Sequence, residues 1–231
     1  MSLSSAGDWA ERRLGYTFRD PALLEAALTH RSAGRANYER LEFLGDSVLN
    51  FVVAVLAFQA YPEASEGDLS RFRAALVSSL TLADLAAELR LGEQLRLGGG
   101  ELKSGGFRRS SILADSLEAV FGAIHLDGGL EAAQGVIERL VEARLAALPA
   151  AHELKDPKTR LQEDLQSRGL ALPKYAVEEV AGEPHDQWFI ASCEVPSLDL
   201  RVRGEGSSRR KAEQDAAQRV LAALTRAGEQ P

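Results

Sequence analysis

The sequence predicts an all-α domain followed by a small α+β domain with the order α-β-β-β-α. Before residue 150, apolar residues recur with helical spacing throughout, whereas beyond residue 156 short stretches typical of strands lie between two helical segments. The change follows Pro149 and two alanines, which are typical of a linker. A length of 231 residues suits one large or two modest domains. We therefore expect domains at residues 1–148 and 156–226, joined by a linker at 149–155.

The helices of the first domain follow from apolar periodicity and from helix-start residues. Asp20 before Pro21, and the segment at 65–68, provide N-terminal capping chemistry. Helices are expected at residues 21–30, 39–60, 67–91, 111–127 and 130–148. A glycine-rich segment at 98–106 interrupts them, and its spacing differs from that of a nucleotide-binding P-loop. It is either a flexible connector or a phosphate contact made by main-chain amides with Lys103, Arg108 and Arg109.

The second domain is expected to begin with a helix at Asp156-Pro157. In that helix Leu161 and Leu165 face inward and Gln162 faces outward. Strands are expected at 175–180, 187–195 and 198–203, separated by turn-rich segments at 181–186 and 196–197. Residues 206–208 then cap a final helix. Its buried stripe is expected to consist of Ala212, Ala216, Val220 and Leu224.

Three carboxylates share one face of the helix expected at 39–60. Glu39, Glu42 and Asp46 lie at i, i+3 and i+7, within roughly 60° of one another at about 100° per residue. The rest of the helix is apolar almost all round. Its core face is expected to carry Leu44, Val48, Phe51, Val52 and Val55. Carboxylates on a largely buried helix repel one another and lose hydration, so they need a positive partner, and the segment holds no lysine. This pattern predicts a bound divalent metal ion.

A second acid pair repeats the pattern. Asp115 and Glu118 lie at i and i+3 in the apolar helix expected at 111–127. Two acid pairs on two helices resemble the inward-pointing carboxylates of metal-binding bundles. Oxygen ligands without cysteine or paired histidine favour Mg²⁺, with Mn²⁺ as a plausible substitute, over zinc.

Composition and charge indicate the cellular compartment but do not identify a binding partner. The single cysteine, Cys193, excludes an intramolecular disulfide framework and fits a reducing compartment. The first residues do not resemble a signal peptide, and the longest apolar run is too short to cross a bilayer. We expect a cytoplasmic protein that does not associate with a membrane. The net charge of −7 does not suggest nucleic acid, but arginine and lysine are clustered at 108–109, 201–203 and 209–211.

The final helix begins with three cations. Arg209, Arg210 and Lys211 stand at a helix N-terminus, where positive charge opposes the helix dipole. A bound anion would compensate for this placement, although a solvated basic turn is the alternative. Gln162 and His185 would add polar contacts suited to 2′-hydroxyls, which is how double-stranded RNA is read.

With these residues in view, the chain resembles bacterial ribonuclease III over nearly its whole length. The matching motifs are residues 37–50, 66–70, 100–110, 113–118, 156–165 and 206–214. The resemblance implies a helical endonuclease domain, a double-stranded-RNA-binding domain, and a homodimer whose two sites cut opposite strands. It implies a catalytic metal set of Glu42, Asp46, Asp115 and Glu118, with Glu39 and Glu66 in secondary acidic positions. Dimerisation would also cover the second apolar face of the helix at 39–60.

The implied activity is hydrolysis of duplex RNA by metal-activated water, leaving 5′-phosphate and 3′-hydroxyl ends. Processing of ribosomal RNA precursors and other structured transcripts, including messenger RNA, is the role that the resemblance implies. Hydrolysis by water is favoured over a covalent or histidine-based mechanism, because the acids have no cysteine near them and His125 lies two turns beyond Glu118. A non-catalytic RNA chaperone or scaffold would not need four such acids. A di-metal oxidase would need Glu-x-x-His pairs, which Glu42 and Glu118 do not form.

Overall fold

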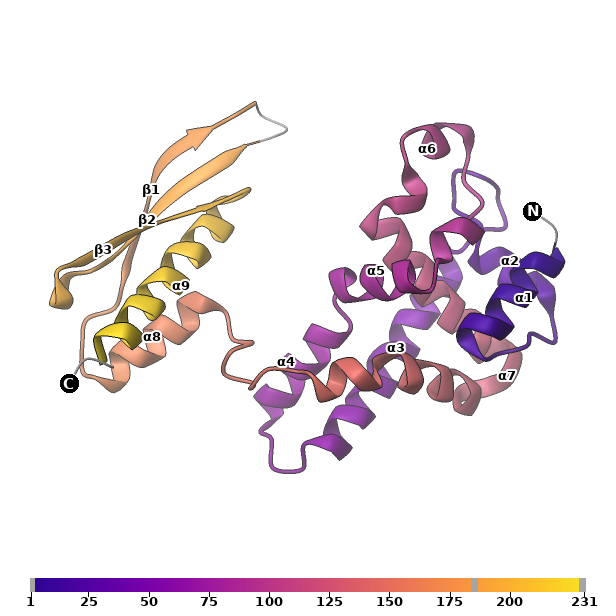
Figure 1. The fold of residues 1–231 in the computed structure, drawn as a ribbon, viewed down its shortest axis with the longest axis horizontal. Helices are drawn as coiled ribbons and strands as arrows, with labels where there is room; N and C mark the ends of the chain where they lie inside the picture. The colour runs from indigo at the N-terminus through magenta and orange to yellow at the C-terminus, as the bar shows by residue number, and fades with distance from the viewer. Residues whose placement is uncertain (1–2, 184–186, 229–231) are drawn as a thin grey trace. The chain divides into compact units, whose positions relative to one another are not determined.

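The computed structural model describes residues 3–183 and 187–228 (Figure 1). The chain divides into two compact units, residues 1–151 and 152–231. The first is helical and the second combines two helices with a three-stranded sheet. The predicted fold class, an all-α domain followed by an α+β domain, is confirmed.

The described part of the first unit contains seven α-helices and two short 3₁₀ turns. These are α1 (Leu3–Leu14), α2 (Pro21–Ala27), α3 (Glu39–Ala60), α4 (Glu66–Leu76), α5 (Ser79–Glu88), η1 (Leu91–Gln94), α6 (Gly99–Lys103), η2 (Gly106–Arg108) and α7 (Ser110–Ala146). Helix α1 was not expected from the sequence. It is fixed by Trp9, which is 4% exposed and whose Nε1 donates to the main-chain oxygen of Leu89 at 2.8 Å.

Two helix boundaries differ from the prediction or refine it. The single helix expected at 67–91 is wrong, because the chain breaks at Val77 and Ser78. Ser78 adopts an extended conformation and its side chain caps α5 by accepting from the main-chain N–H of Thr81. The break expected between residues 127 and 130 falls at Gly129, whose φ of 84° lies in the left-handed region. Helix α7 therefore consists of two helical parts that meet at this glycine.

The core of the first unit forms where α3 packs against the first part of α7. Leu49, Val52 and Val53 on α3 are almost fully buried, as are Phe121 and Ile124 on α7. Burying such side chains stabilises a fold by about 1.5–3 kcal/mol each. The expected core face of α3 was wrong at Phe51, whose side chain is 54% exposed. Of the described helices, α3 is long and apolar enough to span a membrane, a test that the core helix of a soluble protein also passes.

The second unit contains α8 (Pro157–Ser167), β1 (Lys174–Ala181), β2 (Trp188–Val195), a 3₁₀ turn η3 (Pro196–Leu198), β3 (Leu200–Gly206) and α9 (Arg209–Gly228). The strands pair antiparallel in the order β1-β2-β3, with Cys193 opposite both Tyr175 and Val202. Figure 1 shows α8 and α9 together beside the sheet. Their shared core contains Leu161, Leu165, Ala216, Val220 and Leu224. The helical spacing of apolar residues had predicted that all five are buried.

The third strand begins later than the sequence predicts. Residues 196–198 form the η3 turn, and Asp199 takes a left-handed conformation with φ 47° before β3 starts at Leu200. A proline cannot donate a ladder hydrogen bond, so the connection turns before strand pairing resumes. At the other end of β3, Ser208 caps α9 as expected, because its Oγ accepts from the main-chain N–H of Lys211 at 3.2 Å.

Candidate metal centre and nucleic-acid interface

Two glycines allow α3 and α7 to cross with their backbones in contact. A Cβ added to Gly45 would collide with the main-chain carbonyl of Glu118 and would lie 2.9 Å from the nitrogen of Gly122. A Cβ added to Gly122 would collide in turn with the carbonyl of Leu41. A larger residue at either position would push the two helices apart. The close crossing that the glycines allow therefore brings the acids of α3 next to those of α7.

Three of the predicted acids meet at this crossing. Carboxylate oxygens of Glu42, Asp115 and Glu118 lie within 4.8 Å of one another, and all three residues are partly buried. The group contains carboxylates alone, and such hard oxygen donors suit Mg²⁺ or Mn²⁺. The two helices that supply them, α3 and α7, are the ones on which the sequence placed the acid pairs.

Asp46 lies beside this group without belonging to its closest set. It is exposed, and its Oδ1 accepts a hydrogen bond from Asn50 Nδ2 at 2.8 Å. It is still close enough for its charge to act on the cluster, because it contributes to raising the pKa of Glu118. Asp46, the fourth predicted ligand, therefore lies one helical turn from Glu42, and its carboxylate is hydrogen-bonded to Asn50 on the same helix.

The electrostatics of the cluster favour a cation. Burial, followed by the charges of Asp46, Asp115 and Glu42, raises the pKa of Glu118 to about 8. Burial is also the main cause that raises the pKa values of Glu42 and Asp115. Carboxylates that are partly desolvated and crowded in this way resist ionisation, and a divalent cation among them would reverse that tendency. The donor set and its charge thus fit the predicted metal.

The two secondary acids, Glu39 and Glu66, lie at different distances from the three-carboxylate group. Glu39 is at the start of α3, half exposed, and pairs with Arg31 at 3.7 Å. Its charge contributes to raising the pKa of Glu42, so it lies at the edge of the cluster. Glu66 is exposed at the start of α4, where its Oε1 accepts from Ser70 Oγ at 2.8 Å. Among the described residues, Glu66 is not in the three-carboxylate group.

Sequence reasoning missed residues that lie around the acids. His30, Arg31, Tyr38 and Glu101 line a recess of about 260 Å³ that Glu42 and Asp115 also line. Burial, with the charges of Asp115 and Glu42, raises the pKa of Tyr38, so its hydroxyl stays protonated. His30 and Arg31 come just after α2 in the sequence, but the pattern of that helix carries no sign that its end reaches α3. Only the fold brings them to the acids.

The glycine-rich segment is partly helical and is hydrogen-bonded to the turn after α2. It contains α6, and the main-chain N–H of Gly98 donates to Ser32 Oγ at 2.9 Å. Arg109 reaches Glu101 at 3.0 Å, and the Arg108 guanidinium lies 5.0 Å from the ring centroid of Phe107. Lys103 is exposed at the end of α6. These three cations therefore remain candidates for phosphate contact.

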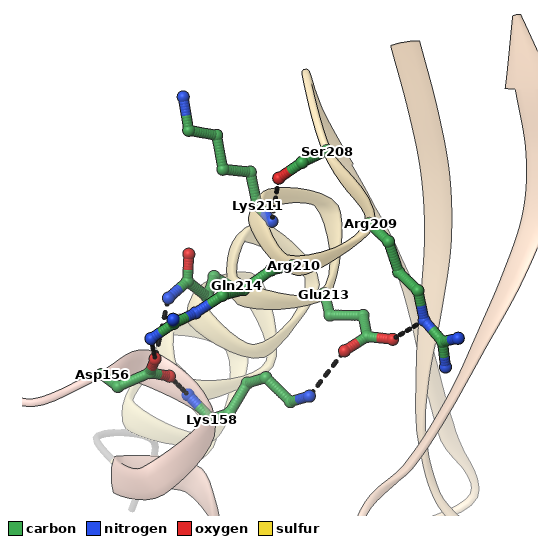
Figure 2. A network of polar contacts seen from close by, with 8 residues as sticks. All are labelled: Asp156, Lys158, Ser208, Arg209, Arg210, Lys211, Glu213 and Gln214. Atoms are coloured by element: carbon green, nitrogen blue, oxygen red, sulfur yellow. Dashed lines mark hydrogen bonds and ion pairs between the residues drawn. The ribbon is translucent and has the colours of Figure 1, made fainter. Parts of the chain in front are cut away.

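In the second unit, two carboxylates neutralise part of the cationic start of α9 (Figure 2). Glu213, whose side chain is 8% exposed, accepts from Lys158 Nζ at 2.6 Å and from Arg209 Nε at 2.9 Å. Asp156 accepts from Gln214 Nε2 at 2.7 Å and from Arg210 Nη2 at 3.3 Å. These two carboxylates therefore already compensate part of the charge of Arg209 and Arg210, and a bound anion at this helix start stays a prediction.

The same cations remain accessible to a ligand. The side chains of Arg209 and Arg210 are 69% and 79% exposed. Figure 2 shows Lys211 extending away from both carboxylates, and its Nζ donates only to Ser207 Oγ, at 3.3 Å, within the part of the chain that is described. Gln162 is exposed on α8, as expected. His185 lies outside the described residues.

One face of α3 is apolar and open. Phe43, Phe51 and Phe58 are 78%, 54% and 69% exposed. Their spacings of eight and fifteen residues place them within roughly 80° on the helix. Several large apolar side chains exposed on one helix face are typical of an interaction site.

Comparison with known proteins gives two family matches and many relatives. Residues 20–145 match a model described as Ribonuclease-III-like, and residues 157–224 match the double-stranded RNA binding motif. A protein of Nitrosococcus oceani called Ribonuclease 3 is 58% identical over 92% of this chain and 92% of its own length. Another, from Hahella chejuensis, is 57% identical over 93% of this chain and 95% of its own.

A solved structure agrees with the first unit. The nuclease domain of ribonuclease III from Campylobacter jejuni is 45% identical, covers 59% of this chain and 96% of its own, and superposes with a TM-score of 0.58. That structure was described for flexibility in a region involved in dimer formation.

Proposed function

This chain belongs to the ribonuclease III family, and we propose that it is an endoribonuclease that hydrolyses both strands of double-stranded RNA with Mg²⁺, for which Mn²⁺ can substitute. The observation that carries the proposal is the meeting of Glu42, Asp115 and Glu118 at the crossing of α3 and α7. The products would carry 5′-phosphate and 3′-hydroxyl ends. Precursors of ribosomal RNA and other structured transcripts in the cytoplasm are the proposed substrates.

The chain's own residues would hold and position the reacting groups. Glu42, Asp115 and Glu118 would hold the metal, and Asp46 would join them by turning away from Asn50. When bound, a divalent cation supplies an activated water and neutralises charge that develops on the phosphate. The crossing at Gly45 holds the two helices together, so Glu42, Asp115 and Glu118 would need little reorganisation, whereas Asp46 would change its side-chain conformation. Glu39 would keep Arg31 beside the site, while Glu66 would act from a more distant position.

The second unit would bind the duplex without reading its sequence. Arg209, Arg210 and Lys211 would contact phosphates, and Gln162 would contact the minor groove. His185 is proposed for the same surface from its motif alone. Lys103, Arg108 and Arg109 would add phosphate contacts from the nuclease domain.

We further propose that two copies form a homodimer through α3. Phe43, Phe51 and Phe58 give this helix an exposed apolar face that a second copy would cover. Two acid clusters would then be available to cut opposite strands.

A direct test uses long duplex RNA with and without Mg²⁺. Wild-type protein is expected to cut only with the metal, and end labelling is expected to reveal 5′-phosphate and 3′-hydroxyl groups. Duplex DNA of the same sequence serves as the control substrate. A protein that binds the RNA yet leaves it intact at every Mg²⁺ concentration would be a non-catalytic binder, and the proposal would be wrong.

A further inference from the structure

The recess beside the acid cluster is lined by hydrogen-bond donors as well as by carboxylates. His30, Arg31, Tyr38 and Arg109 line it together with Glu42 and Asp115. The metal ligands need no such donors, because carboxylates and a cation satisfy one another. A hollow of about 260 Å³ is large enough for a phosphate group. The donors therefore point to an anion that lies next to the metal centre.

Two of these donors are buried. His30 is 5% exposed, and its Nδ1 accepts from the main-chain N–H of Ser32 at 3.1 Å and lies 2.7 Å from Ser32 Oγ, an arrangement that suits a proton on Nε2. Tyr38 is 4% exposed, and its ring meets that of His30 edge-on at 5.5 Å. Within residues 3–183 and 187–228, neither His30 Nε2 nor the Tyr38 hydroxyl is among the fully buried polar atoms that lack a partner. Both residues line the recess, so an acceptor that enters it can pair with these two donors.

The neighbouring cations are held loosely enough to turn toward a ligand. The Arg31 side chain is 71% exposed and lies 3.7 Å from Glu39. Arg109 is about half exposed and pairs with Glu101 at 3.0 Å. Exposed ion pairs of this kind are weak, so a phosphate can compete for either guanidinium.

The backbone around these side chains is fixed. The main-chain N–H of His30 donates to the oxygen of Arg96 at 3.0 Å, and that of Gly98 donates to Ser32 Oγ at 2.9 Å. The turn after α2 is thereby joined to the segment that leads into α6. Tyr38 is held to the same turn, because its main-chain N–H donates to the oxygen of Thr29 at 2.9 Å, so both residues line the recess from anchored positions.

The charge balance links the recess to the metal. Four carboxylates line it, but Glu39 and Glu101 already pair with the two arginines. Glu42 and Asp115 form no ion pair among the described residues, and the charge of Arg31 compensates them only in part, so a divalent cation would complete the balance. An anion is therefore repelled from the empty site and accepted beside the loaded one.

We propose that this recess binds a phosphate of the RNA backbone next to the scissile phosphate. His30 Nε2–H and the Tyr38 hydroxyl donate to its oxygens, and Arg31 and Arg109 supply positive charge. The inference rests on the proposed nuclease function, because it places the substrate that this function requires.

The test measures binding of an isolated cleavage product, which cannot react further, in Mg²⁺. Tyr38→Phe removes one hydroxyl and keeps the ring, and Arg31→Ala removes an exposed side chain, so both variants are expected to fold. Fluorescence anisotropy is expected to show binding weakened about twofold to tenfold by Tyr38→Phe. Arg31→Ala is expected to make the slope of log affinity against log salt shallower by about one unit. Arg12→Ala, an exposed arginine on α1, is the control and should match wild type.

Nuclear magnetic resonance of the histidine rings gives a second measurement. The chain has four histidines, and the ring signal absent from His30→Gln identifies His30. Its Nε2–H signal is expected to move when product and Mg²⁺ are both present. Wild-type binding by both variants, or an unmoved His30 signal, would overturn the recess assignment. If wild-type protein fails to cut duplex RNA in Mg²⁺, the proposed function fails instead, so the two failures are distinguishable.

Discussion

The backbone of Gly45 on α3 lies against the carbonyl of Glu118 on α7, with no room for a Cβ between them. This contact joins the residue before Asp46 to a member of the acid cluster. The separation of the two helices therefore sets the separation of the carboxylates.

Replacing Gly45 with alanine is expected to abolish cleavage and to destabilise the nuclease domain. The added methyl must push α7 away, because it meets main-chain atoms that cannot rotate aside. Overpacking of this kind costs typically about 1–3 kcal/mol. Calorimetry and a cleavage assay check both effects. Gly7→Ala on α1, where a Cβ meets nothing within 4 Å, should retain activity and stability. Wild-type behaviour of Gly45→Ala would contradict the assigned crossing.

Glu118→Gln is expected to eliminate cleavage in Mg²⁺ while leaving RNA binding within about twofold of wild type. The change removes a charged metal ligand and keeps the side-chain volume. Asp46→Asn is expected to behave likewise, although Asp46 lies outside the closest carboxylate group. Gel-shift binding and a cleavage assay on the same duplex measure the two properties. Substantial cutting by either variant would remove that residue from the metal set.

Metal-free stability is expected to depend on pH through Glu118. Its pKa is about 8 in the folded protein, above the ordinary value of 4.5, so the folded state binds the extra proton between these values. Stability from this group is therefore fully present below about pH 4.5 and is lost as pH rises toward 8. With EDTA present to remove metal, the melting temperature of wild type should fall relative to that of Glu118→Gln as pH rises from about 4.5 to about 8. Saturating Mg²⁺ should raise the wild-type value most at the alkaline end. A constant difference between the two proteins across the window would contradict this assignment.

Replacing Arg210 and Lys211 with alanine is expected to weaken binding to all RNA duplexes by a similar factor. Both side chains are exposed at the start of α9, and phosphate contacts carry no base information. The slope of log affinity against log salt should become shallower by about one unit for each phosphate that the variant no longer binds. Anisotropy with two unrelated duplexes over a salt series measures this. Arg226→Ala, near the other end of α9, is the control. An unchanged slope, or weakening confined to one duplex, would show that these residues do not bind the RNA backbone.

Phe51→Asp is expected to convert a dimer into monomers. The side chain is 54% exposed on the apolar face of α3, so a charge there should not disturb the core but would be buried unpaired in a dimer. Analytical ultracentrifugation measures the mass of wild type and variant. Leu102→Asp, another exposed apolar residue on α6, should leave the mass unchanged. A monomeric wild type would show that another partner, or none, covers this face.

Residue spacing along the chain predicted the fold class and the two helices whose acids meet, whereas the fold decided that Glu42 is the α3 acid in the closest group. Helical spacing is a local property, so Glu42 on one helix and Asp115 and Glu118 on another could be assigned to faces before any fold was known. Alternation in the second unit likewise predicted its strands. The limit of such reasoning appears at residues 67–91, where continuous apolar spacing hides the cap at Ser78 that separates α4 from α5.

The groups that surround those acids, in contrast, are set by the packing of distant segments. His30 and Arg31 reach the cluster because the turn after α2 is hydrogen-bonded to Tyr38, at the start of α3, and to the segment before α6. Asp156 reaches Arg210 on α9, and Lys158 reaches Glu213, because α8 packs against α9. Spacing within one helix records which residues share a face, but it holds no information about what packs against that face. Charge compensation and hydrogen bonding act through space, and so they depend on contacts that the fold alone creates.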